Sequence, residues 1–198
     1  MSESLQLIKY RSLLSDLGGL ILETEKRVVS ENPDPLFYNN VNFYVKMYLT
    51  AICTYLEAYL QDIAFSIADT FNNKIEDAKI PKNFLMWAIS RSADLKEKDQ
   101  DINYFSGKIS KKDIADSISP NPFKTISTFR MLGIDLMNCE EFRNNKSQIG
   151  SIVGKRNGII HHNDKASDLS FSDLRTHIQI CQKYIHAIDT YINAKELG

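Results

Sequence analysis

Residues that interrupt helices are scarce in this sequence, which has eight glycines and five prolines among its 198 residues. Such a composition is poorly suited to a fold of many short strands joined by tight turns. Hydrophobic residues instead recur at helical spacing along most of the chain. We therefore predict an all-α helical bundle of about five to six helices.

Cysteine is also rare, and the three cysteines, Cys53, Cys139 and Cys181, lie far apart. Their odd number and the lack of a C-x-x-C pair argue against a disulfide framework and against a zinc ribbon. The sequence also lacks a glycine-rich phosphate-binding loop, a nucleophile elbow and an H-E-x-x-H motif. We therefore predict reduced thiols, no metal site and no cofactor.

Charge of one sign is not in excess, because 24 basic residues nearly balance 25 acidic ones. The resulting net charge of −1 gives no general attraction to nucleic acids or membranes, so any nucleic-acid function must rest on a local patch. No run of about 18 apolar residues is present, and the charged N-terminal stretch does not resemble a signal peptide. These absences predict a cytoplasmic protein without a membrane-spanning helix.

The expected organisation is a single domain over residues 1–198. Its most polar part, at about residues 92–119, is predicted to be a surface insertion, with a helical or functional part inside it because long loops are uncommon in compact domains. Ser170 and Asp173 form a pattern close to a capping box, which marks the start of the last helix. The helices are expected at about residues 4–30, 39–73, 81–91, 122–135, 139–162 and 171–197.

The helix expected at residues 39–73 carries aromatic and aliphatic residues on more than one face. A helix that is apolar nearly all round is usually central to a bundle or part of an oligomer interface. Glu57 lies in the middle of it, between Leu56 and Ala58. This glutamate lies either on the one solvated stripe of the helix or at a site, as a buried carboxylate.

The stretch from Gly154 to Asp164 places polar residues inside an apolar helical pattern. On a helical wheel, Ile149 and Ile160 fall within about 40° of Arg156, so the guanidinium lies in the middle of the apolar stripe. A group that cannot lose its charge needs an anionic partner there. That partner is either a buried carboxylate, for which Glu57 is the candidate, or a phosphate that comes and goes.

Two neighbours of Arg156 lie beside the stripe. Asn157 and His161 are four residues apart and therefore share a face of the helix, and a histidine can transfer protons near neutral pH. His162 points about 100° away from His161, which favours a supporting or solvent-exposed role. Asn157 and Gly158 could also form a turn, but the flanking residues have helical periodicity, so we prefer a helix.

The same region has a local excess of positive charge. Between residues 142 and 163 there are four basic residues and no acidic one. Such a strip is typical of surfaces that bind anionic backbones, although a solvated basic face is an equal alternative. Its members are Arg143, Lys146, Lys155 and Arg156.

Residues 156–161, Arg-Asn-Gly-Ile-Ile-His, resemble the R-N-x-x-x-H motif of the HEPN superfamily. The resemblance extends to the long aromatic helix with "TYLEAYL", the "NPF…LGI" segment and the long last helix. HEPN domains are small all-α bundles, and many are ribonucleases of bacterial toxin–antitoxin and anti-phage systems. The resemblance therefore implies an HEPN-like bundle that acts as a toxin or defence effector on RNA.

The resemblance implies a role for each residue of the motif. Arg156 would hold the scissile phosphate, His161 would transfer protons, and Asn157 would orient one of them, with Glu57, His162 and Lys155 in support. Such enzymes usually need no metal and let the RNA 2′-hydroxyl attack the adjacent phosphate. They usually dimerise, so that two motifs face one cleft, and an antitoxin or defence-system protein would be a further partner.

Two other functions remain open from the sequence. One is a non-catalytic HEPN module that binds RNA, a nucleotide or a protein. The other is a structural dimerisation domain in which Arg156 is locked in a buried ion pair with Glu57. Loss of Arg156 would then destabilise the fold strongly, because it would leave a buried charge unpaired.

Overall fold

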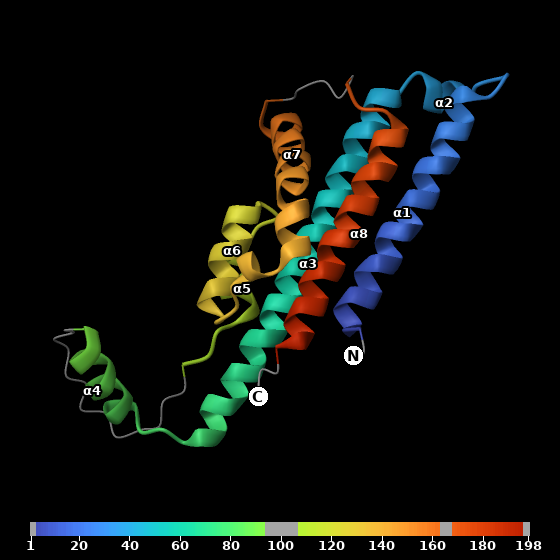
Figure 1. Ribbon diagram of the computed structural model, residues 1–198. Coiled ribbons are helices and arrows are strands. Elements are labelled where there is room, and N and C mark those ends of the chain that lie inside the picture. The colour runs from blue at the N-terminus through green and yellow to red at the C-terminus, as the bar shows by residue number, and fades with distance from the viewer. Residues whose placement is uncertain (1–2, 94–106, 163–167, 196–198) are drawn as a thin grey trace.

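The computed structural model of the protein describes residues 3–93, 107–162 and 168–195 (Figure 1). Helices make up nearly all of the regular structure in these ranges, which confirms the prediction of an all-α bundle. The helices are α1 (Leu5–Val29), α2 (Pro35–Tyr38), α3 (Val41–Ala78), α4 (Lys82–Ala93), α5 (Lys111–Ser117), α6 (Pro122–Met131), the 3-10 helix η1 (Leu136–Asn138), α7 (Glu140–His162) and α8 (Phe171–Ala194).

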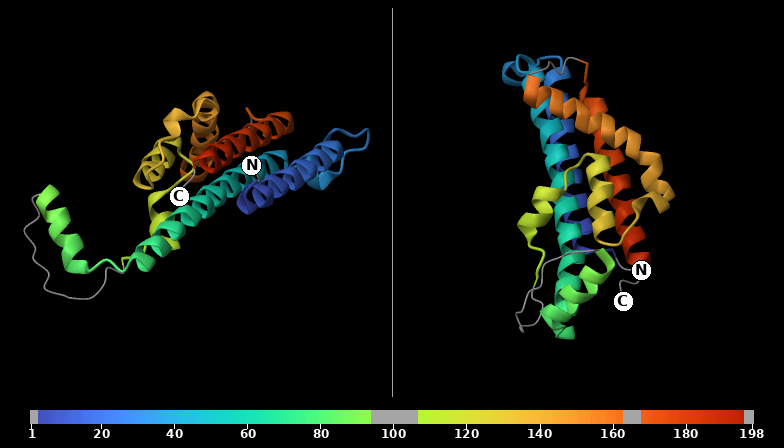
Figure 2. Two further views of the ribbon diagram at one scale, coloured as in Figure 1. Left: turned by 60° about the horizontal axis from the view of Figure 1, so that its bottom comes forward. Right: turned by 90° about the vertical axis from the view of Figure 1, so that its left-hand side faces the viewer.

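The three longest helices, α1, α3 and α8, pack against one another along the bundle, and α7 packs on α3 and α8 (Figures 1 and 2). The helices α5 and α6 lie against α3 beside the first half of α7. As a result, the second half of α7 lies over the beginning of α3. This arrangement places the motif predicted from the sequence next to Glu57.

Helix α3 is central because neighbours on several sides cover it. Its buried side chains face α1, α8, α7 and α5, which accounts for an apolar pattern on more than one side. The hydroxyl of Tyr59, which is fully buried, donates a hydrogen bond of 2.9 Å to the carbonyl oxygen of Ile185 in α8. The first of the two predicted explanations, a central helix, is therefore confirmed.

Part of the segment predicted as a surface insertion is a packed helix. Ser110 and Asp113 form a capping box that starts α5, and Ile114 and Ile118 are buried in the core. Ile109, which precedes this capping box, is held by the side-chain amide of Asn72 in α3. The amide donates to the carbonyl oxygen of Ile109 and accepts from its N–H. Apolar residues at helical spacing explain why this stretch packs although its composition is polar; residues 94–106 lie outside the described residues.

Local signals define the other helix boundaries. Ser170 and Asp173 form the predicted capping box, and Asn121 caps α6, whose first residue is Pro122. Helix α4 extends away from the bundle beyond the end of α3 (Figure 1). In the described ranges, no helix combines the length and the hydropathy that crossing a membrane requires.

Candidate active site

Helix α7 passes through Asn157 and Gly158 without interruption, so the predicted helix, and not the alternative turn, is formed here. Its buried side chains are those of Phe142, Ile149, Ile152, Val153 and Ile159. Ile160, which was expected to pack, is 47% exposed. The buried face of this last part of α7 is set by Ile159, which points about 100° away from Ile160.

Arg156 lies within the buried stripe but is poorly satisfied by its surroundings. Its Nη2 is 3.8 Å from Oε2 of Glu57, an ion pair that is too long for a hydrogen bond, and its Nη1 donates to Oδ1 of Asn157 at 3.1 Å. Its Nε is buried and has no hydrogen-bond partner among the described residues. A guanidinium has five N–H donors, and among the described residues only Asn157 accepts a hydrogen bond from this one.

The pair is neither fully buried nor fully solvated. The side chain of Arg156 is 21% exposed and that of Glu57 is 31% exposed. The structure therefore brings Glu57 to Arg156, as the sequence suggested, but in a loose contact that solvent reaches. An anion that approached from solvent could bind the guanidinium without first breaking a short hydrogen bond to Glu57.

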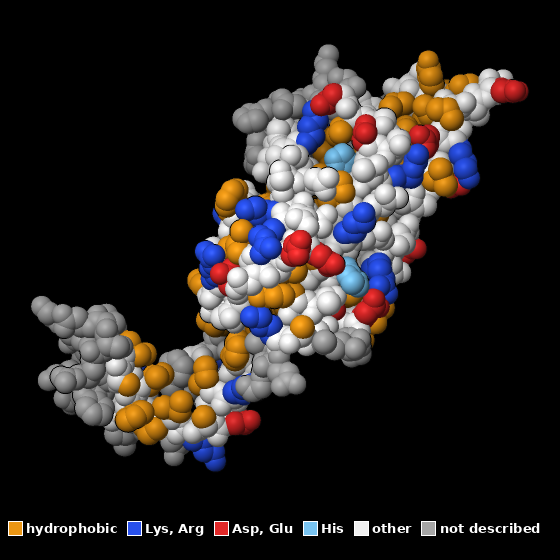
Figure 3. All heavy atoms as spheres, viewed as in Figure 1, with side chains coloured by type: hydrophobic (Ala, Val, Ile, Leu, Met, Phe, Trp, Pro, Cys, Tyr) orange, Lys and Arg blue, Asp and Glu red, His pale blue; other side chains and the backbone are white. Residues whose placement is uncertain are grey.

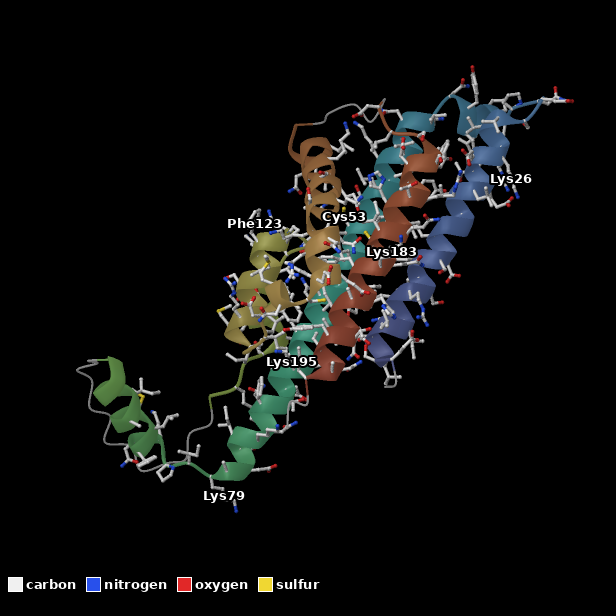
Figure 4. All side chains as sticks on the ribbon, viewed as in Figure 1. Lys26, Cys53, Lys79, Phe123, Lys183 and Lys195 are labelled. Atoms are coloured by element: carbon white, nitrogen blue, oxygen red, sulfur yellow. The ribbon has the colours of Figure 1, made fainter. Side chains whose placement is uncertain are left out.

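Cys53, one helical turn before Glu57 on α3, forms part of the surroundings of this pair (Figure 4). Burial raises the pKa of its thiol to about 12; the Arg156 guanidinium lowers this pKa and the Glu57 carboxylate raises it. The thiol is therefore protonated at neutral pH and acts as a small apolar group. It is a poor nucleophile because nucleophilic attack requires the thiolate.

Lys155 points to a different partner. Its Nζ is 2.5 and 2.7 Å from the two carboxylate oxygens of Asp168, just before α8. The hydrogen bond from Lys155 lowers the pKa of Asp168. Lys155 is thus engaged at the junction between α7 and α8 and is not directed at the Arg156–Glu57 pair.

The remaining members of the basic strip lie along the first half of α7. Arg143 donates a hydrogen bond of 2.6 Å to the carbonyl oxygen of Met137, and the Nζ of Lys146 lies 5.6 Å from the centre of the Phe123 ring. The predicted strip is therefore divided into a part next to α6, a lysine bound to Asp168, and Arg156 itself.

The two histidines of the motif belong to the last turn of α7. The side chains of His161 and His162 lie outside the described residues. The described part of the motif is therefore Arg156 and Asn157, with Glu57 opposite them on α3.

The family model described as RiboL-PSP-HEPN matches residues 6–194, which is nearly the whole chain. The chain belongs to this HEPN family. Searches of curated proteins and of solved structures returned no match. The resemblance inferred from the motif and from the helix pattern is therefore confirmed at the level of the family.

Three residues that contact α7 or its Arg156–Glu57 pair were not predicted from the sequence. Cys53 could have been found, because it precedes Glu57 by one helical turn. Asp168 and Phe123 have no comparable signal, because each reaches α7 from a different element. Their contacts depend on how the chain folds back between α6, α7 and α8.

Proposed function

We propose that this HEPN protein is a metal-independent endoribonuclease with Arg156 as its phosphate-binding group. The observation that carries the proposal is the state of this guanidinium. It lies in an apolar stripe, its Nε has no partner among the described residues, and its ion pair with Glu57 is 3.8 Å long. A phosphate accepts two parallel hydrogen bonds from an arginine and would supply the missing acceptors.

The proposed reaction is an attack by the RNA on its own backbone. The 2′-hydroxyl oxygen forms a bond to the adjacent phosphorus as one His161 takes its proton, and the bond from phosphorus to the 5′-oxygen breaks as that oxygen receives a proton from a second His161 or, less efficiently, from water. The products are a 2′,3′-cyclic phosphate and a 5′-hydroxyl. Arg156 stabilises the additional negative charge on the phosphoryl oxygens. Asn157 orients the guanidinium of Arg156, because its Oδ1 accepts a hydrogen bond from Nη1.

We propose that two copies of the chain form one cleft, because a single motif supplies one arginine and one histidine. Exposed apolar side chains near the ends of α3 and α7 support this arrangement. Phe43 is 62% exposed, Met47 is 41% exposed and Ile160 is 47% exposed. The end of α7 lies beside the beginning of α3 in both Figures 1 and 2, so these residues lie at the end of the bundle that carries the motif.

The direct test is incubation of the purified protein with RNA in EDTA. We expect fragments that end in a 2′,3′-cyclic phosphate, and no cleavage at a position whose nucleotide carries a 2′-deoxyribose. His161→Ala should remove the activity. Cleavage of the 2′-deoxy position, or a strict need for added Mg²⁺, would contradict the mechanism. RNA binding without turnover would favour a non-catalytic HEPN module.

A mixing experiment tests the shared cleft. Arg156→Ala and His161→Ala are each expected to be inactive, but a heterodimer of the two variants retains one arginine and one histidine in the same cleft. Co-expression with different affinity tags, followed by tandem purification, should recover part of the activity. A heterodimer as inactive as either variant would contradict a composite site.

For the cellular role, we propose a toxin or an anti-phage effector, on the strength of the family resemblance. Induced expression of the parent chain in a bacterial host should arrest growth and degrade cellular RNA. The Arg156→Ala variant, expressed to the same level, should do neither. Equal growth with both proteins would count against this role.

A further inference from the structure

Phe123, near the start of α6, presents a large aromatic ring to solvent. Its side chain is 74% exposed, and the ammonium group of Lys146 in α7 lies over the ring, 5.6 Å from its centre (Figure 4). Exposed aromatic rings beside cations form the stacking platforms to which single-stranded nucleic acids bind. A base of a single strand could therefore stack on the exposed face of this ring.

Further cations lie on the two helices that carry Phe123 and Lys146. Lys124, Arg130 and Arg143 are exposed on α6 and α7, and Figure 3 shows basic and hydrophobic side chains interleaved over these two helices. Helix α6 itself contains no acidic residue. Asp135 lies 3.3 Å from Arg130, but such an exposed pair is weak and does not prevent Arg130 from binding a phosphate.

The surface next to the ring is hollow. An open depression of about 470 Å³ is lined by Phe123, Ile126, Ser127, Arg130 and Met131. Met131 is itself 70% exposed. A flat base could pack on the apolar floor of this depression, with its phosphate next to Arg130 at the edge.

The flank of α7 that leads from this ring to the motif borders the buried stripe of the helix. Asn157 lies about 16 Å along the helix from Lys146, and the two residues are separated by only about 20° around the helix axis. Gly150 lies between them, and a Cβ built at this position would meet no atom within 4 Å. The two acidic residues of α7, Glu140 and Glu141, point about 120° or more away from Lys146, so α7 itself places no acidic side chain on this flank.

We propose that this flank is a track for single-stranded RNA: a base stacks on Phe123, Lys146 and its neighbours bind phosphates, and the strand passes Gly150 to reach Asn157 and Arg156. A single strand fits better than a duplex because stacking needs a base whose face is free. The identity of the strand as RNA rests on the proposed function, whereas the stacking and the phosphate contacts do not.

Binding of a labelled 2′-O-methyl RNA of about 12 nucleotides tests the track, because its blocked 2′-oxygen prevents cleavage and its length matches typical single-strand sites. By fluorescence anisotropy, Phe123→Ala should weaken binding at least about fivefold, and Phe123→Trp should retain it. Phe84→Ala removes another exposed ring, 56% against 74% for Phe123, on α4 and away from the track, and serves as the control. Equal affinity of the parent and Phe123→Ala would overturn the proposal and leave the patch as a protein-contact surface.

The salt dependence tests the phosphate contacts. Lys146→Gln should reduce the slope of log K against log salt by about 0.7, the value for one phosphate contact to a single strand. Lys9→Gln is the matched control, because Lys9 also lies over a ring, that of Tyr10, but on α1. An unchanged slope for Lys146→Gln would overturn the role of this lysine and of the track.

Gly150 provides a test that leaves the stacking ring intact. Gly150→Asp should weaken binding because it places an anion on the track, whereas Gly150→Ala should bind like the parent; circular dichroism checks that both are folded. Loss of binding in both, or in neither, would overturn the path along α7.

The outcome for the track is separable from that for catalysis. If no RNA is cleaved but Phe123→Ala and Gly150→Asp weaken binding as expected, the proposed function fails and the track stands. If RNA is cleaved and neither substitution changes binding or kcat/KM, the track fails and the proposed function stands.

Discussion

Two arginines each reach from one helix to a glutamate on another, but they are held very differently. Arg175 of α8 donates a direct hydrogen bond to Glu25 of α1. Arg156 of α7 remains 3.8 Å from Glu57 of α3 and makes no hydrogen bond to it. The side chain of Arg156 is nevertheless the less exposed of the two, at 21% against 33%.

This difference separates a structural ion pair from a candidate binding site. A charge taken further out of water needs closer partners, because the loss of hydration must be compensated. Arg175 follows this rule and Arg156 does not. Arg156 therefore has a buried Nε without a hydrogen-bond partner among the described residues, whereas Arg175 donates directly to its glutamate.

The largest expected difference between the two arginines is catalytic. Arg156→Ala should reduce the rate of RNA cleavage about 100- to 1,000-fold, as expected when one donor to a developing negative charge is removed. Arg175→Ala should leave the rate nearly unchanged, because Arg175 contacts Glu25 and not the motif. Initial rates on the same RNA measure both, and an equal loss in the two variants would remove the distinction.

The two substitutions should rank in the opposite order by their effect on thermal stability. Arg175→Ala breaks a direct pair and should lower the Tm by about 2–4 °C, which corresponds to about 1 kcal/mol in a chain of this size. Arg156→Ala removes a poorly satisfied group and should lower the Tm less. Thermal unfolding followed by circular dichroism provides the measurement. A loss of several kcal/mol in Arg156→Ala would instead support the structural role that the sequence left open.

A smaller effect is expected from the cation next to Arg156. Asp168→Asn would release Lys155, so the affinity for 2′-O-methyl RNA should rise slightly.

The hydrogen bond from Lys155 lowers the pKa of Asp168 below its ordinary value of 3.8, so the carboxylate is ionised at neutral pH. The stabilisation by this pair is present above that ordinary value and is lost as the pH falls through the lowered pKa.

Binding assays at neutral pH and acid titrations of the parent and Asp168→Asn check this prediction. The two proteins should differ at neutral pH and converge in strong acid. A difference that persists unchanged in strong acid would show that Asp168 acts through something other than its charge.

The smallest effect is expected at Cys53. Since burial raises the pKa of its thiol to about 12, Cys53→Ala should retain RNA cleavage at neutral pH. The native protein should also react slowly with thiol reagents, because all three cysteines are buried. Abolished cleavage in a folded Cys53→Ala protein would show that the thiol has a chemical role beside Arg156.

The sequence by itself determined the class of fold and the location of the motif. Helical periodicity and capping residues such as Ser170 and Asp173 are local, so they can be recognised without knowledge of the folded chain. The position of Arg156 in an apolar stripe could be predicted for the same reason, since it depends on helical geometry alone.

Only the tertiary structure decided which partner each polar group meets. The two arginine–glutamate contacts end as one direct pair and one loose pair, because helix packing sets the distance between their backbones. The packing of α5 and the contact of Phe123 with Lys146 depend in the same way on segments that are distant in the sequence. Periodicity specifies the face on which a side chain lies, but the distance to its partner is fixed only when the helices pack.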